Sequence, residues 1–204
     1  MARKQGEPEK KPTPDALARL LASYAASDEA KARRLLREHP EAIRAKTSGT
    51  GETALHWCVI EQQQDAVAFL IAQGADVNQL DDLKYSALQY AVTHRDLTIL
   101  KMLIAKGANP NTMSHLEETP LEDGIQAGQL EGVEVLLRAG AKVTYELHTA
   151  IELGDVKAVQ LMLKYGADPS VRVHGRTAAE VAEAYGHVDV AALLKSVAAA
   201  APSK

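Results

Sequence analysis

Two stretches of the chain decide its fold: residues 53–80 read TALHWCVIEQQQDAVAFLIAQGADVNQL, and residues 86–113 read SALQYAVTHRDLTILKMLIAKGANPNTM. They match each other at a spacing of 33 residues. A Gly-Ala pair recurs with the same spacing of 33 residues, with its glycines at Gly74, Gly107 and Gly140. A fourth pair begins at Gly166, only 26 residues after Gly140. Self-similarity at such a period indicates a repeat architecture, in which each unit packs against its neighbours.

Each unit is predicted to contain two short amphipathic helices. The first helix begins after a hydroxyl residue that can accept hydrogen bonds from the free amides of the first turn: Thr53, Ser86, Thr119 and Thr177. Three of these precede, by three residues, a side chain that can complete a capping box: Gln89, Glu122 and Glu180. The second helix has apolar residues at helical spacing and ends at the repeat glycine, which suits a left-handed C-terminal cap.

The composition is that of a folded globular chain. Apolar residues make up 46% of the 204 residues and aromatic ones only 4%, so Leu, Val, Ile and Ala must fill the core. The single cysteine, Cys58, fits a reducing compartment, and no signal-like segment or long apolar run is present. We therefore expect a cytoplasmic protein without a membrane segment, while a nuclear location stays open.

The charge distribution bears on the kind of partner. The net charge is −4, but residues 1–14 and Lys204 together carry +3, which leaves −7 on the rest of the chain. A protein that neutralises phosphates needs clustered Lys and Arg on its folded part. The sequence therefore disfavours nucleic acid as a partner.

The repeated motifs resemble those of the ankyrin repeat. They are Thr53-Ala54-Leu55-His56, Thr119-Pro120-Leu121, Gly74-Ala75-Asp76-Val77-Asn78, Gly107-Ala108-Asn109-Pro110-Asn111 and Gly166-Ala167-Asp168-Pro169. The resemblance covers residues 15–198. It implies an all-α repeat solenoid, built from ankyrin-type helix pairs with β-hairpin fingers.

We divide the ankyrin-like region into six units. A capping unit (15–45) precedes regular repeats (46–78, 79–111 and 112–144), a short repeat (145–170) and a C-terminal cap (171–198). The fifth unit should lack its finger, because 7 residues lead from Gly140 to Leu147 where 14 lead from Gly107 to Leu121. We expect residues 1–14, with three prolines, to form a disordered arm, and residues 199–204 a flexible tail.

The residues give little support to enzymatic chemistry. The seven histidines are dispersed, with no pair four residues apart that could form a helical zinc site, so we expect no metal and no cofactor. The resemblance gives His56 and His148 a structural hydrogen bond at the helix entry. Cys58 stands at a small-residue position of an inner helix, and Gly51 is interpreted as a finger glycine, not as part of a phosphate loop. A hydrolase or metal enzyme, with a site between finger and groove, is the contrary hypothesis.

The resemblance implies that a partner protein binds through the finger tips and the exposed positions of the inner helices. In this chain those positions are Ile60, Glu61, Asp82, Leu83, Tyr85, Thr93, His94, His115, Leu116, Glu118 and Gln126. Several are apolar where a solvated loop would be polar, which indicates a binding surface. Trp57 and Tyr90 are either packed between repeats or interface hot spots. Lys84 replaces the family's finger glycine, so its φ should be positive or the finger distorted.

These observations favour a monomeric, non-enzymatic protein–protein interaction module, acting as an adaptor or scaffold. The alternative is a dedicated inhibitor or regulatory subunit of one enzyme. Such a protein would use the gap left by the missing fifth finger, near Glu152 and Leu153, to receive a protruding element of that enzyme.

Overall fold

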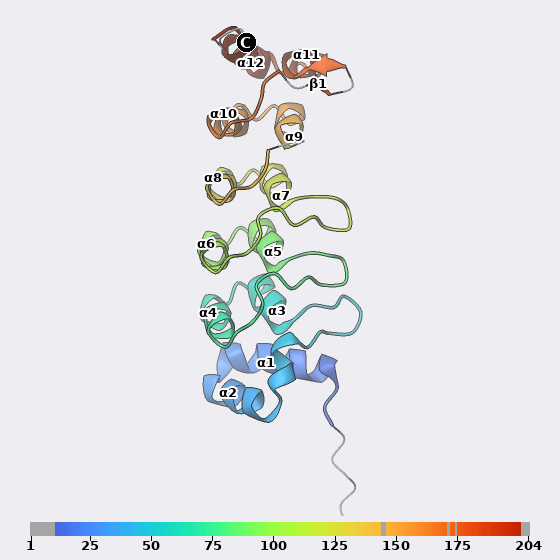
Figure 1. Ribbon diagram of the computed structural model, residues 1–204, viewed down its shortest axis with the longest axis vertical. Coiled ribbons are helices and arrows are strands. Elements are labelled where there is room, and N and C mark those ends of the chain that lie inside the picture. Colours follow the sequence, from blue (N-terminus) through green and yellow to red (C-terminus); the bar gives the residue numbers. More distant parts are fainter. Residues whose placement is uncertain (1–10, 144–145, 171, 174, 201–204) are drawn as a thin grey trace, which may run out of the picture.

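A computed structural model describes residues 11–143, 146–170, 172–173 and 175–200, and it shows helix pairs stacked in two columns (Figure 1). The inner column contains α1 (Pro14–Ser27), α3 (Ala54–Ile60), α5 (Ala87–Thr93), α7 (Pro120–Gln126), α9 (Glu146–Glu152) and α11 (Ala178–Ala184). The outer column contains α2 (Glu29–Glu38), α4 (Gln64–Ala72), α6 (Leu97–Ala105), α8 (Leu130–Arg138), α10 (Val156–Lys164) and α12 (Val188–Ala200). A 3-10 helix, η1 (Pro40–Arg44), follows α2. The all-α repeat solenoid predicted from the sequence is confirmed.

Hydroxyl caps begin the inner helices at the predicted residues, Thr53, Ser86, Thr119 and Thr177. The capping boxes completed by Gln89 and Glu180 are confirmed. The one predicted for Glu122 is wrong, because its Oε1 accepts a hydrogen bond from Thr149 Oγ1 of α9 at 3.1 Å. Thr119 Oγ1 in turn donates to Glu146 Oε1 at 2.9 Å. Hydrogen bonds to the next unit therefore take the place of the capping-box bond within the helix.

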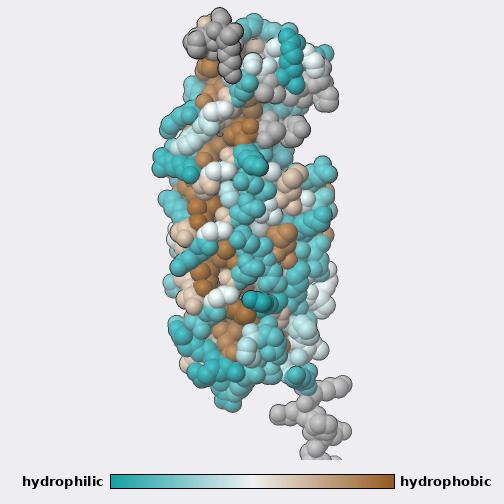
Figure 2. All heavy atoms as spheres, viewed as in Figure 1, coloured by the Kyte–Doolittle hydropathy of each residue, from teal (hydrophilic) through white to brown (hydrophobic). Residues whose placement is uncertain are grey.

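The core lies between the two columns and between successive helix pairs. A leucine near the start of the inner helix is buried at the equivalent position of four units: Leu55, Leu88, Leu121 and Leu147. Burying one such side chain contributes about 1.5–3 kcal/mol to the free energy of unfolding. Figure 2 shows apolar side chains in one stripe along the length of the stack. Stability is therefore distributed over interfaces between neighbouring units, as in other solenoids.

Loops project to one side of the stack before α3, α5 and α7 (Figure 1). The described residues form a strand pair only in the last unit, between β1 (Arg172–Val173) and β2 (Arg176–Thr177). The second finger has a single bridge between Leu80 and Ser86. The fingers expected as β-hairpins are thus mainly turns in the second to fourth units. A backbone hydrogen bond closes each of them, as from Asp81 N to Tyr85 O at 3.0 Å, and the Asp81 side chain accepts further N–H groups.

The fifth unit lacks its finger, as its short connection predicts. The segment after α8 passes Gly140 and α9 already begins at Glu146. Figure 1 shows no loop projecting before α9. The end of this connection, residues 144–145, lies outside the described residues.

Both ends of the helical region extend beyond the predicted boundaries. α1 begins at Pro14, within the segment assigned to the arm, because Thr13 Oγ1 caps it by accepting from Ala16 N at 3.2 Å. α12 continues to Ala200 through a run of alanines, the residue with the highest helix propensity. Residues 1–10 and 201–204 of the expected arm and tail lie outside the described residues. As far as the description reaches, the chain has no helix that combines the length and the apolar character needed to cross a bilayer.

Asparagine side chains join successive glycine segments along the stack. Asn78 Nδ2 donates to Gly107 O at 3.0 Å, and one unit later Asn111 Nδ2 donates to Gly140 O at 3.1 Å. Each asparagine Oδ1 also accepts from the backbone N–H two residues beyond that glycine, at 2.8 Å in both cases. This ladder therefore continues into the segment that precedes the unit without a finger.

Candidate functional site

The tips of the second and third fingers expose large apolar side chains. Leu83 is 41% exposed, and on the next finger Met113 and Leu116 are 51% and 59% exposed. The tips are joined, because the Leu83 carbonyl accepts from the His115 backbone N–H at 3.0 Å. Leu83, Met113 and Leu116 are called the finger patch from here on, and Figure 2 shows apolar atoms on this side of the stack. The sequence interpretation misses Met113, although an apolar residue on a polar loop is the same signal that singles out Leu116.

The first and second fingers are joined in a similar way. Asp82 N donates to Thr50 O at 3.0 Å, and Lys46 Nζ lies 2.9 Å from Asp82 Oδ1. Gly51 has a φ of 73°, and a Cβ at this position would collide with the Asp82 carboxylate. The interpretation of Gly51 as a finger glycine is confirmed. Asp82, one of the predicted partner-binding residues, is exposed but already ion-paired within the chain.

Lys84 adopts the positive φ expected from its place in the finger. Its φ is 61°, and Glu117, at the equivalent position one unit later, has a φ of 64°. Residues other than glycine rarely adopt this conformation, so the surrounding hydrogen bonds must hold it. The sequence interpretation names Lys84 alone, although the spacing of 33 residues leads directly to Glu117.

A buried carboxylate and two tyrosines fix the second finger. Asp81 Oδ1 accepts from the N–H groups of Leu83 at 2.9 Å and Tyr85 at 2.8 Å, and its Oδ2 accepts from the Tyr90 hydroxyl at 2.7 Å. The Tyr85 and Tyr90 ring centres lie 5.7 Å apart, and His115 packs 5.9 Å from Tyr85. Burial raises the pKa of Tyr90, and the hydrogen bond to Asp81 adds to this rise. The half-buried tyrosines therefore connect the finger tips to α5.

The other predicted partner-binding residues follow the inner helices. Glu61, Thr93 and Gln126 are exposed, whereas Ile60 and His94 are half-buried. Direct contacts join one part of the predicted set into a single cluster around the second and third fingers: Leu83, Tyr85, Tyr90, His94, His115 and Glu118. The other predicted inner-helix residues lie along the inner column, beside this cluster.

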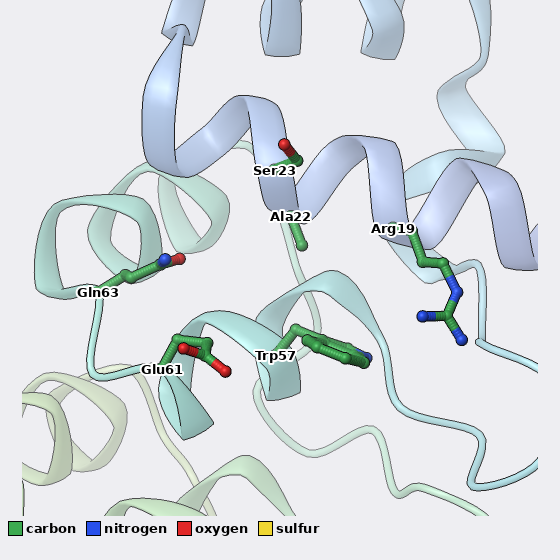
Figure 3. A pocket seen from close by; sticks show the side chains of 6 residues that line it. All are labelled: Arg19, Ala22, Ser23, Trp57, Glu61 and Gln63. Carbon is green, nitrogen blue, oxygen red and sulfur yellow. The ribbon is translucent and has the colours of Figure 1, made fainter.

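Trp57 lines a hollow between α1 and α3 (Figure 3). The hollow has a volume of about 230 Å³ and is bordered by Arg19, Ala22, Ser23, Trp57, Glu61 and Gln63. The Arg19 guanidinium lies 5.5 Å from the centre of the indole ring, within the range of a cation–π contact. The Trp57 Nε1 is buried and has no hydrogen-bond partner in the described part of the chain. Trp57 thus packs against the core and also faces a surface hollow.

Carboxylates gather where the third finger meets α7: Glu118, Glu122 and Asp123. Asp123 is buried and accepts a hydrogen bond from Gln89 Nε2 at 3.2 Å. Burial raises the pKa of Asp123 to about 6 against the lowering effect of Gln89, and the charges of Glu118 and Glu122 add to the rise. Burial also raises the pKa of Glu122, with a contribution from the charges of Glu146 and Glu118. The sequence interpretation includes Glu118 and misses the other two.

Two histidines, His56 and His148, stand at the helix entries to which the resemblance assigns a structural hydrogen bond. His56 is buried, and its Nδ1 lies 2.8 Å from Thr53 Oγ1 in a capping box, as the resemblance implies. Burial lowers the pKa of His56. His148 Nε2 lies 3.1 Å from Glu152 Oε1 on its own helix. The capping position equivalent to Thr53 is Tyr145, which lies outside the described residues.

Cys58 and the residue types that bind metals are the remaining candidates for chemistry. Cys58 is buried, and burial raises the pKa of its thiol to about 12, so the thiolate needed for nucleophilic attack is scarce at neutral pH. Among the residues whose positions are described, no three His, Cys, Asp or Glu side chains are grouped so that they could hold a metal ion.

Comparison with known families agrees with this geometry. The family model described as "Ankyrin repeats (3 copies)" matches residues 20–114 and 79–146, and the one described as "Ankyrin repeat" matches residues 145–172. The comparison with curated proteins gave no match. The matched residues cover most of the chain and include the fifth unit, which has no finger. The chain belongs to the ankyrin-repeat family.

Proposed function

We propose that this protein is a non-enzymatic interaction module that binds a partner protein through the finger patch and the adjoining inner-helix surface. Ankyrin repeats are generally protein–protein interaction modules, and the family is typically non-enzymatic. The observation that carries the proposal is the exposure of Leu83 and Leu116, at 41% and 59%, on two joined finger tips. Exposed apolar side chains that cluster in this way are typical of binding sites.

The hydrogen bonds within and between the fingers support this proposal. Asp81 holds the second finger through its hydrogen bonds to Leu83 N, Tyr85 N and the Tyr90 hydroxyl. The His115 bond to the Leu83 carbonyl then fixes the third finger against the second. A loop that is ordered before binding loses less conformational entropy when the partner arrives, so more of the contact energy appears as affinity.

The other residues implied by the family resemblance extend the proposed surface. We expect Ile60, Glu61, Thr93, His94 and Gln126 to contact the partner from the inner column. Trp57 and Tyr90 would then support the interface from beneath, because both are half-buried and packed against the core. The free thiol of Cys58 is compatible with a reducing compartment, and we propose that the protein acts in the cytoplasm.

The proposal is tested with the double variant Leu83→Ala/Leu116→Ala. The tagged full-length chain is used to isolate its partner from the native host, and the dissociation constant of the purified complex is then measured by calorimetry. We expect the double variant to lose more than about 2 kcal/mol of binding free energy, because apolar side chains at an interface centre carry much of the affinity. The matched control is Leu20→Ala/Val188→Ala, which removes two exposed apolar side chains at the two ends of the stack.

If the finger-tip variant bound the partner with unchanged affinity while the control variant bound it more weakly, the binding surface would lie at an end of the stack and not at the finger patch. If the isolated partner is an enzyme, its activity is measured at increasing ratios of the two proteins. Inhibition that is complete at one molecule of this chain per enzyme would assign the role of a dedicated inhibitor or regulatory subunit, and unaltered activity would assign that of an adaptor.

A further inference from the structure

The carboxylates beside the finger patch differ from several carboxylates of the outer column, which are paired with basic side chains. Asp28 pairs with Lys31, Glu38 with Arg34, and Glu134 with Arg138 and Lys164. Glu117, Glu118 and Glu122 lie beside the finger patch, and we call them the acidic rim. The ion pairs formed among the described residues include none of these three. The rim therefore keeps negative charge that no basic side chain of the described chain neutralises at contact distance.

The hydrogen bonds donated to the acidic rim come from neutral side chains. Glu118 accepts from the Tyr85 hydroxyl at 3.4 Å, and Glu122 accepts from Thr149 Oγ1 at 3.1 Å. Beside them, Asp123 accepts from the Gln89 amide. Hydrogen bonds from hydroxyl and amide groups orient a carboxylate without removing its charge. A cation supplied by another molecule would therefore gain an attraction that this chain does not already satisfy.

The negative charge is also crowded. Burial raises the pKa of Asp123 to about 6, with added contributions from the charges of Glu118 and Glu122. A positive group at the rim would relieve this mutual repulsion. Lys84 brings one positive charge to the tip of the second finger, where it is exposed, but it forms none of the ion pairs found among the described residues.

Apolar and acidic groups are thus neighbours on the same loops. Leu116 and Glu117 are adjacent in sequence at the tip of the third finger, and Glu118 follows where the finger returns to α7. The next finger is missing, because the connection from Gly140 reaches α9 at Glu146. A partner segment lying across the tips can therefore continue beyond the third finger without meeting a fourth.

Resting on the proposed function, we propose that the finger patch and the acidic rim bind an amphipathic protein segment that carries Lys or Arg side chains next to apolar ones. The apolar side chains would cover Leu83, Met113 and Leu116, and the cationic ones would lie against Glu117, Glu118 and Glu122. The charge of the surface argues against other occupants. Nucleic acid and anionic lipid headgroups would be repelled, and a second copy of this chain, docked by the same face, would bring like charges together.

The experiment is a selection of displayed random peptides of about 16 residues on the immobilised full-length chain. The enriched peptides are synthesised, and their dissociation constants are measured at low and high salt. Three variants are compared: the patch variant Leu83→Ala/Leu116→Ala, the rim variant Glu117→Gln/Glu118→Gln/Glu122→Gln, and a control, Asp65→Asn/Glu131→Gln/Asp189→Asn. The control removes the same number of negative charges from first turns of outer-column helices.

We expect the enriched peptides to combine apolar residues with an excess of Lys and Arg. Their dissociation constants should rise about tenfold or more in the rim variant and in high salt, and stay within about twofold in the control. This inference would be overturned if the peptides needed Leu83 and Leu116 but showed no excess of Lys and Arg, or if they bound the rim variant as well as the natural chain. Either result would leave the proposed function standing. A selection that yields no peptide, or only peptides that bind the patch variant equally well, would overturn both.

Discussion

The fourth and fifth units differ in one element and agree in the rest. Each consists of two short helices, and α9 packs on α7 as α7 packs on α5. The fourth unit reaches its inner helix through a finger that carries Leu116, whereas the fifth passes from Gly140 to Glu146 without one. The asparagine ladder continues past this point through Asn111. The stack is therefore held by helix faces and by hydrogen bonds between glycine segments, while the fingers project from it and carry exposed apolar side chains.

The strongest test of this comparison removes the equivalent core leucine from each unit. Leu121→Ala and Leu147→Ala should each lower the free energy of unfolding by about 3 kcal/mol, because both side chains are buried and each change leaves a cavity. Urea unfolding followed by circular dichroism gives the two values. Leu116→Ala, which truncates an exposed side chain of a finger, serves as the control and should cost less than about 0.5 kcal/mol. A cost below about 1 kcal/mol for Leu147→Ala alone would show that the fifth unit is not stacked like the fourth.

The asparagine ladder offers a second, smaller effect. Asn111→Ala should lower the free energy of unfolding by about 1–2 kcal/mol, because it removes hydrogen bonds to Gly140 O and Lys142 N. Asn78→Ala makes the same change between two units that both have fingers, and it should cost a similar amount. If only Asn78→Ala were destabilising, the ladder would not hold the junction with the unit that lacks a finger.

Asp123 should make the fourth unit sensitive to pH, whereas the fifth has Thr149 at the equivalent position. The pKa of Asp123 is raised to about 6 in the folded protein, so the folded form binds a proton more readily than the unfolded chain. The unfolding free energy should therefore rise as the pH falls from 7.5 to 5, by about 1 kcal/mol from this residue. The Asp123→Asn variant should lack this pH-dependent change in unfolding free energy, and it should be more stable than the natural chain at pH 7.5.

The Asp123 prediction is checked by urea unfolding at several pH values. Glu131→Gln, a change at an exposed outer-column carboxylate, controls for the loss of one charge. A natural chain and an Asp123→Asn variant with parallel pH profiles would contradict the assigned burial effect.

The smallest expected effect comes from restoring the missing finger. Inserting a copy of residues 114–120 between Val143 and Thr144 should change the free energy of unfolding by less than about 1 kcal/mol, because lengthening a surface loop has a low entropic cost. Partner binding should fall, since the new finger would block the open space beyond the third one. An insertion of seven Gly and Ser residues distinguishes a specific steric block from simple loop lengthening. Unaltered binding in both variants would confine the interface to the second, third and fourth units.

Local patterns determined the repeat architecture of this protein. The spacing of the Gly-Ala pairs and the hydroxyl caps predicted the helix pairs of the second to sixth units, because helix starts and stops depend on a few neighbouring residues. The short connection between Gly140 and Leu147 predicted the missing finger, because the chain there is too short to form one. The positive φ of Lys84 was predictable for the same reason, since its place in the repeat sets its backbone conformation.

Only the tertiary structure decided how the units use their polar side chains. The Glu122 side chain accepts a hydrogen bond from Thr149 of the next unit and does not complete a capping box on its own helix. The Leu83 carbonyl accepts a hydrogen bond from the backbone N–H of His115, about one repeat away. The burial of Asp123 follows from the packing of α7 between its neighbours, which the composition of α7 does not reveal. Such contacts join residues about 30 positions apart, so they depend on the stacking of whole units. Helix caps and periodicity report only on residues within one turn of each other.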